Sequence, residues 1–390
     1  MFNKAEEIQR SHQINQIETF DTSRFTTKLG SDDAKFLLID SKPKLGDTQA
    51  QEENELNIFK IFDIEWQRGD SGKRAPIVIK NVDKRMTSGL WSSEWFKKKF
   101  SGQDDINVDL INCENGREIQ SVPISYFWSG FDKVGDKVLL DRVTKKVFNI
   151  LKLKDWPPAK DFKVVLQDQY YDLMDNLPVK EYCNRDGTLN LAANVPEHFL
   201  KPDLGPKLYI AYSSADAPKA GTTNLHIDIS DAFNVIMHVG ESTEIDEEKF
   251  RKIIRYSGIS EDQIKRYTEG KERPGAIWHL FKPDDADKIR TFLFEKESSK
   301  ISKNAHNLDK ITSGDFIHDQ RFYLDAERLV ELKVDYNVTP YTILQFVGDA
   351  IFIPAGAPHQ VKINRTFKIF TYNSKFGTNK FSLYFKGSKC

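Results

Sequence analysis

Residues 221–239 read GTTNLHIDISDAFNVIMHV, and residues 348–360 read GDAIFIPAGAPHQ. The first stretch places His226 and Asp228 just before a run of apolar and β-branched residues, which is typical of a buried strand. The second is a turn, an apolar strand and a Pro/Gly turn that ends at His359. Side chains two apart on an extended segment point the same way, so His226 and Asp228 can face one ion together. The second turn can direct His359 across a small barrel toward that pair.

Short strand-like runs dominate the chain from residue 207 onward, with a charged helical insertion at about 243–273 and a helix-rich one at about 284–334. Strands joined by turns and long insertions favour a barrel or jelly roll over alternating βαβ units. The sequence therefore predicts a mainly β protein with flanking helices. The expected strands in this half of the chain are residues 207–212, 234–239, 276–280 and 342–346.

The composition and hydrophobic pattern of the sequence change three times along the chain, which suggests four segments. They are a polar N-terminal extension (1–55), an α/β region leading into the barrel (56–180), the catalytic barrel with its helical insertions (181–375) and a basic C-terminal tail (376–390). The α/β region is expected to contain helices at 58–66, 125–131 and 161–177, and strands at 76–82 and 108–113.

Composition excludes several classes of protein. The 390 residues carry 57 Lys and Arg against 58 Asp and Glu, so the net charge of −1 lacks the signature of a dedicated nucleic-acid binder. Three cysteines cannot supply a disulfide framework or a cysteine-rich zinc finger. No apolar run approaches the roughly 20 residues of a membrane helix, and the polar start lacks the core of a secretory signal. A soluble intracellular protein, without a membrane partner, is expected.

The two histidines and the aspartate suggest a metal site. A His-x-Asp pair alone is expected by chance in a chain of this size, and a lone His226 is more often a surface or core histidine than a metal ligand. The pair combined with His359 matches the 2-His-1-carboxylate facial triad of non-haem Fe(II) oxygenases, which leaves coordination positions open. We therefore predict that His226, Asp228 and His359 are the catalytic metal ligands.

From about Ile58 to Val361 the sequence resembles the JmjC oxygenases, and within them the subfamily that demethylates lysine 9 of histone H3. The resemblance implies a double-stranded β-helix, the cupin-like JmjC barrel, with His226, Asp228 and His359 as the iron ligands. The segments that carry it are Leu153–Pro158, Arg185–Gly187, Leu189–Ala192, Lys201–Lys207, Gly221–Asp231, Pro274–His279, Ile317–Gln320 and Gly348–Val361.

The resemblance also implies Fe(II), 2-oxoglutarate as cosubstrate, and O2. Thr223 is similar to the hydroxyl donor for the distal carboxylate of 2-oxoglutarate, although it could equally cap a turn. Asn234 is expected either to bind the cosubstrate or to satisfy buried backbone. The subfamily carries a lysine after this strand, whereas residues 240–243 here read GEST. We expect Lys271 and Arg273 either to replace that lysine as the cation for the distal carboxylate or to be solvated.

The function implied by the resemblance is oxidative demethylation of methylated histone lysine, with mono- or dimethylated lysine 9 of histone H3 as the expected substrate. Such an enzyme would be a chromatin and transcription regulator in the nucleus, with the histone H3 tail as partner and homodimerisation as a family property. Two alternatives stay open: a catalytically impaired JmjC protein that binds chromatin, and a JmjC hydroxylase acting on a non-histone protein.

Two further features bear on the site. Tyr209 and Tyr212, on the strand before the His-Asp pair, either line the pocket or belong to the core. After Val361 the chain departs from the subfamily, with seven Lys and Arg and no Asp or Glu. Residues 366–372 could still form the last barrel strand, and without that strand the barrel would lack a wall beside His359.

Overall fold

A computed structural model describes the parts of the chain on which the fold and the site depend. The described residues are 26–31, 33–41, 48–68, 74–112, 116–129, 151–158, 160–190, 193, 205–211, 221–240, 248, 250–254, 257–301, 314–363 and 369–376.

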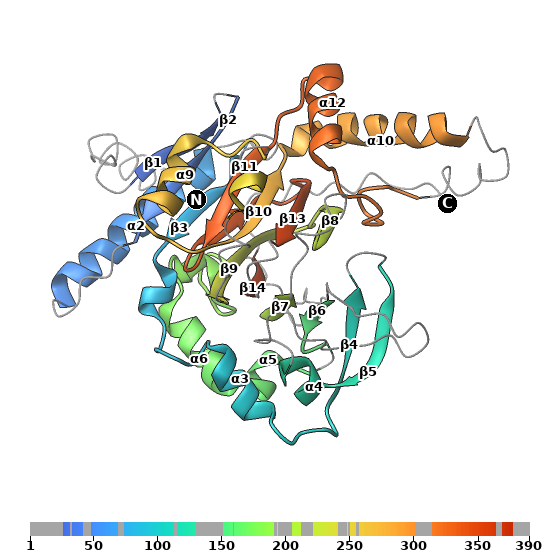
Figure 1. The fold of residues 1–390 in the computed structure, drawn as a ribbon. Coiled ribbons are helices and arrows are strands. Elements are labelled where there is room, and N and C mark those ends of the chain that lie inside the picture. Colours follow the sequence, from blue (N-terminus) through green and yellow to red (C-terminus); the bar gives the residue numbers. More distant parts are fainter. Residues whose placement is uncertain are drawn as a thin grey trace, which may run out of the picture.

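Strands make up the centre of the protein and helices surround it (Figure 1). The strands are β1 (Thr26–Ser31), β2 (Ala34–Asp40), β3 (Ile77–Lys80), β4 (Asn107–Asn112), β5 (Glu118–Pro123), β6 (Leu151–Trp156), β7 (Lys207–Ala211), β8 (Thr223–His226), β9 (Asp231–Val239), β10 (Pro274–Leu280), β11 (Tyr341–Phe346), β12 (Ala350–Ile353), β13 (His359–Ile363) and β14 (Ile369–Phe376). The α-helices are α2 (Thr48–Arg68), α3 (Ser93–Phe100), α4 (Ile124–Ser129), α5 (Phe162–Val165), α6 (Gln167–Asn176), α7 (Lys180–Cys183), α9 (Glu261–Thr268), α10 (Ala286–Ile301) and α12 (Ala326–Tyr336), with short 3-10 helices at Val82–Arg85 and Pro283–Asp285.

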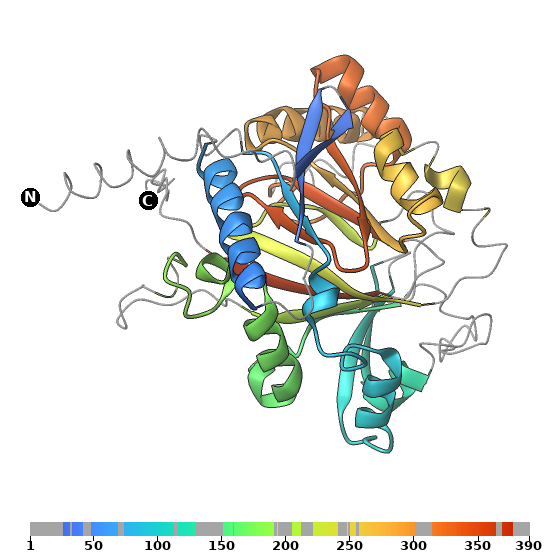
Figure 2. The ribbon, with the colours of Figure 1, turned by 90° about the vertical axis from the view of Figure 1, so that its left-hand side faces the viewer.

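The strands form two sheets that together make the barrel. The larger sheet has the order β1-β2-β3-β12-β9-β14-β7-β6-β4-β5, and the smaller has the order β11-β10-β13-β8. All neighbouring strands pair antiparallel except β2 and β3. Curled antiparallel sheets with flanking helices confirm the predicted jelly-roll fold, and the helices α10 and α12 lie on the opposite side of the barrel from α3, α4, α5 and α6 (Figures 1 and 2).

Strand β9 shows how the barrel acquires an inner and an outer face. Phe233, Val235 and Met237 pack into the core beneath the helices of the N-terminal half. The alternate residues Ala232 and Ile236 pack between the two sheets. Because both faces are buried, most residues of the strand are apolar, with Asn234 as a buried polar exception, and this composition made the strand visible in the sequence.

Helix α2 closes the outer face of the large sheet beside β12 (Figure 2). The ring of Phe62 packs edge-on against Phe352 of β12, with centroids 4.7 Å apart. The predicted helix at 58–66 is confirmed, and the structure extends it to Thr48–Arg68. The helix predicted at 161–177 is instead two helices, because the backbone of Leu166 leaves the helical region (φ −132°, ψ 64°) between α5 and α6.

Strand β14 fills the centre of the large sheet. It pairs with β9 on one side and with β7 on the other, both antiparallel. The last barrel strand therefore exists, and it covers Ile369–Phe376 instead of the expected 366–372. The departure of the sequence after Val361 leaves this wall in place.

The N-terminal segment contributes to the same sheet. Strands β1 and β2 form a hairpin at its edge, and β2 pairs in parallel with β3. These strands lie within the predicted polar extension (1–55), and the division into four segments stays a prediction. Among the described helices, none has both the length and the apolar character required to cross a membrane.

Candidate metal centre

A bulge between β8 and β13 directs the candidate site residues on these strands into the barrel. His226 of β8 is paired with His359 of β13, and Thr223 is paired with Val361, with a register shift between the two pairs. His359 and Val361 lie two apart, so both face the same side. Val361 packs in the inner core, so this side is the barrel interior. The extra residue on β8 allows Thr223 and His226, three apart, to share that side.

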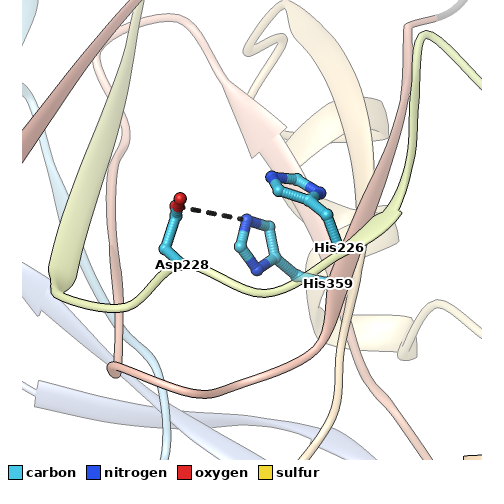
Figure 3. Close-up of side chains that lie close together, drawn as sticks. All are labelled: His226, Asp228 and His359. Carbon is cyan, nitrogen blue, oxygen red and sulfur yellow. Dashed lines mark ion pairs between the residues drawn. The ribbon is translucent and has the colours of Figure 1, made fainter. Parts of the chain in front are cut away.

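The three predicted ligands come together at the end of β8 and the start of β13 (Figure 3). One nitrogen or oxygen from each of His226, Asp228 and His359 lies within 4.8 Å of the others. Asp228 Oδ2 is 3.8 Å from His359 Nε2, and the two imidazole rings have centroids 4.1 Å apart. Two imidazoles and one carboxylate in such a cluster form a donor set that fits a divalent transition metal such as Fe(II).

Backbone carbonyls orient both histidines. His226 Nδ1 is 2.9 Å from the carbonyl oxygen of Asn224, and His359 Nδ1 is 2.9 Å from that of Ala357. A carbonyl oxygen only accepts hydrogen bonds, so each Nδ1 carries the proton and each Nε2 keeps its lone pair. This arrangement is the usual one behind metal-binding histidines, where the second nitrogen fixes the ring. Both rings are therefore prepared for metal through Nε2.

Asp231, which forms a buried ion pair with Arg74, connects the two segments that carry the candidate ligands. The amide of Ala355, in the turn before His359, donates to Asp231 Oδ1 at 2.7 Å. Arg74 Nη1 lies 3.3 Å from both oxygens of Asp231, and its guanidinium stacks on Trp66. The amide of Gly356 also donates to the carbonyl of Asp228 at 2.9 Å. We call Arg74, Asp231 and the Ala355 amide the clamp, because together they fix the distance between the His-Asp segment and the turn.

A hydrogen-bonded network lies inside the barrel beside the ligands. The ring of Trp278 stacks on His359 at 6.1 Å, and its indole N–H donates to Gln345 Oε1 at 2.7 Å. Gln345 Nε2 in turn donates to the side-chain oxygen of Asn234 at 3.1 Å. Asn234 is thus held by another side chain within the barrel. Its contact with a cosubstrate, like that of Thr223, stays a prediction.

The outer face of β13 is anchored directly behind His359. Gln360 accepts from the amide of Leu324 at 2.8 Å and donates to its carbonyl at 2.7 Å. Its amide group also lies 3.3 Å from His279 Nδ1. Burial lowers the pKa of His279 to about 4, so this histidine is neutral at physiological pH. Burial also lowers the pKa of Lys362 in the same layer.

The other predicted site residues lie in different surroundings. Lys271 and Arg273 are exposed to solvent, as the second of their two interpretations expected. The hydroxyl of Tyr209 donates to the carboxylate of Asp155 on β6. Tyr212 and residues 241–243 lie outside the described residues.

Sequence reasoning missed the clamp and one lysine near β8. Asp231 directly follows the His-Asp segment, but its partner Arg74 is 157 residues away in the chain. Lys152 Nζ donates to the carbonyl of Thr222, 70 residues further on. No local signal connects either pair, because each depends on how distant strands meet.

No protein-family model matches the chain. Curated proteins do match it. Lysine-specific demethylase 3A of Mus musculus is 40% identical over 315 residues, which cover 80% of this chain and 23% of the relative. Lysine-specific demethylase 3 of Drosophila melanogaster is 40% identical over 306 residues, covering 77% of this chain and 34% of the relative.

A third relative, the probable JmjC domain-containing histone demethylation protein 2C of Homo sapiens, is 38% identical over 315 residues, covering 78% of this chain and 12% of the relative. The chain thus spans about a quarter of the length of the mouse relative and less of the human one. All three matches extend over most of the chain, which has the strand-rich fold described above. The chain is therefore related by sequence, over about four fifths of its length, to the JmjC lysine-specific demethylases.

Proposed function

We propose that this chain catalyses Fe(II)- and 2-oxoglutarate-dependent oxidative demethylation of histone lysine, with mono- or dimethylated lysine 9 of histone H3 as substrate. The proposal includes action on chromatin in the nucleus. The observation that carries it is the cluster of His226, Asp228 and His359 with both Nε2 atoms left for metal. The names of the relatives, which are lysine-specific demethylases, support the substrate class.

In this proposal His226, Asp228 and His359 hold the iron. Three protein ligands leave coordination positions for the cosubstrate and for O2. Held by these residues, iron and 2-oxoglutarate would supply the oxidation of the N-methyl carbon by O2, with succinate and CO2 as the coproducts. The hydroxymethyl group then leaves the lysine nitrogen as formaldehyde, which lowers the methylation state by one.

The chain's own residues orient the ligands and limit water. His359 is 2% exposed and is covered by the stacked ring of Trp278. The carbonyls of Asn224 and Ala357 fix the two imidazoles before metal arrives. Such preorganisation reduces the rearrangement required when the metal and cosubstrate bind. His226 and Asp228 are partly exposed whereas His359 is buried, and the exposed side chain of Ile229 follows Asp228, so a peptide would approach from this side.

The test is turnover of a dimethyl-lysine-9 histone H3 peptide by the purified chain with Fe(II), ascorbate and 2-oxoglutarate, followed by mass spectrometry and a formaldehyde assay. Wild type should remove one methylene mass per turnover, and His226→Ala should abolish this. His318→Ala is the matched control, because His318 is an exposed histidine outside the cluster and its loss should leave turnover unchanged.

Other results would contradict the proposal. A stable gain of one oxygen without formaldehyde would indicate a protein hydroxylase. Normal iron binding with no change in the histone peptide would indicate a chromatin-binding protein without demethylase activity. Failure of wild type to bind iron would contradict the metal site itself.

A further inference from the structure

A lysine of the large sheet points into the barrel. Lys152 on β6 is directly opposite Ala211 on β7, and directly opposite residues of an antiparallel pair share one face of the sheet. Ala211 packs in the inner core between the two sheets. The neighbouring pair, Leu153 and Ile210, packs in the outer core. Lys152 therefore faces the interior, where a charged side chain is costly unless it has an anionic or hydrogen-bonding partner.

The ammonium group of Lys152 reaches across to the smaller sheet. Nζ donates to the carbonyl oxygen of Thr222 at 2.5 Å. Thr222 is itself fixed, because its amide donates to the carbonyl of Val361 and its hydroxyl accepts from the amide of Ile363, both at 2.9 Å. The ammonium is thus held next to the first residue of β8.

That position lies on the path from the metal cluster into the barrel. Thr223 follows Thr222 directly and shares the inner face with His226 because of the bulge. A ligand that contacts metal at His226 and extends along β8 would meet the Thr223 hydroxyl and then the Lys152 ammonium. A hydroxyl and an ammonium side by side suit a carboxylate, which accepts hydrogen bonds only.

We propose that Lys152 is the cationic residue that binds the distal carboxylate of the 2-oxo dicarboxylate cosubstrate, together with Thr223. This inference rests on the proposed function, since it assigns a residue to that function's cosubstrate. The cations considered from the sequence, Lys271 and Arg273, are solvent-exposed. An ammonium offers three N–H donors, so its contact with Thr222 is compatible with a further bond to a carboxylate.

The competing explanation is structural: Lys152 would only tie β6 to the start of β8. The two explanations differ in which ligands they affect. If Lys152 only connects the strands, its loss should weaken the binding of all cosubstrate analogues equally. If Lys152 binds the carboxylate, its loss should weaken the binding of a dicarboxylate more than that of a monocarboxylate of the same length.

The experiment measures binding without turnover. The chain is loaded with Mn(II) in place of iron and titrated calorimetrically with 2-oxoglutarate and with 2-oxopentanoate, which has a methyl group in place of the distal carboxylate. Wild type should prefer the dicarboxylate. Lys152→Met should weaken 2-oxoglutarate binding by about 10- to 100-fold, the usual effect of losing a charge-assisted hydrogen bond, and leave 2-oxopentanoate binding nearly unchanged.

Lys207→Met is the matched control. Lys207 lies on the same face of the neighbouring strand β7, but its ammonium donates to the carbonyl of Pro157 at 2.9 Å, toward the other end of that strand. Its loss should leave the preference for the dicarboxylate intact. If Lys152→Met does not fold, Lys152→Gln replaces it, because an amide keeps a donor for Thr222 and removes only the charge.

The outcomes separate the two proposals. If wild type binds Mn(II) but neither oxo acid, both the proposed function and this inference are wrong. If wild type binds 2-oxoglutarate and the Lys152 variants keep its preference, or weaken both ligands equally, only the assignment of Lys152 is wrong. Loss of the preference in Lys207→Met alone would also overturn it.

Discussion

Replacing Arg74 with methionine should loosen the candidate metal site from a distance. The change removes the guanidinium of the clamp and keeps an unbranched side chain of similar length. Asp231 would then remain as a buried carboxylate without its cation, although the amide of Ala355 would still donate to it. The segment carrying Asp228 and the turn before His359 would no longer be held at a fixed separation.

The magnitude follows from the burial of the pair. Arg74 and Asp231 are 5% and 2% exposed. Removing one partner of a buried ion pair costs about 3–5 kcal/mol, chiefly because the other charge is left uncompensated. The retained Ala355 bond and the 3.3 Å separations in this pair favour the lower end of that range. We expect a loss of about 3 kcal/mol in unfolding free energy and, as for other supporting residues of metal ligands, about 10- to 100-fold weaker metal binding.

The assay is urea unfolding of the metal-free protein, with Mn(II) titration of the folded protein in parallel. Arg290→Met is the matched control: Arg290 contacts both Asp287 and Asp315, yet it is 37% exposed, so its loss should cost less than about 1 kcal/mol. Equal stability of Arg74→Met and Arg290→Met, or Mn(II) binding by Arg74→Met as tight as that of wild type, would contradict the supporting role of Arg74.

Three further predictions concern other parts of the protein. Because burial lowers the pKa of His279 to about 4 while the unfolded value is near 6.5, the unfolded chain binds more protons between these pH values, and stability should fall as pH drops through that window. His279→Gln should show a shallower fall in urea titrations, and an identical pH dependence would contradict the buried neutral histidine. Ending the chain after Ile363 removes β14 from between β9 and β7, so cooperative thermal unfolding should be lost; a truncated chain that melts like wild type would refute that strand's place. Ile229 is 84% exposed next to Asp228, so Ile229→Ser should raise the KM for the histone peptide in steady-state kinetics and leave the KM for 2-oxoglutarate unchanged. An equal rise in both KM values would contradict a role in peptide binding.

Strands and turns that depend on a local sequence pattern could be predicted from the sequence. The largely apolar strand β9 and the apolar strand β12 were visible because burial on both faces imposes a recognisable composition. The turn before His359 was visible through its Pro and Gly residues. The His226–Asp228 pair and His359 were found through the residue types that bind metal and through a family resemblance. The structure brings the three side chains together, and their role as ligands stays a prediction.

What the sequence could not predict depends on distant pairing. The inward direction of Thr223 requires the bulge between β8 and β13, which leaves no mark in a single strand. Arg74 and Lys152 act on residues that are 157 and 70 positions away. The break at Leu166 is similarly invisible, because the apolar periodicity of 161–177 continues through it.

The central position of β14 has a consequence for biosynthesis. Its two neighbours, β7 and β9, leave the ribosome well over a hundred residues before it does. At a synthesis rate of about 5–20 residues per second, the position between β7 and β9 in the large sheet stays unfilled for on the order of ten seconds. During that time the facing edges of β7 and β9 present unpaired backbone groups, which readily accept a strand from any other chain. Production of this protein should therefore depend on chaperones that shield those edges, and co-translational exchange of β14 between neighbouring nascent chains is the misassembly to be expected.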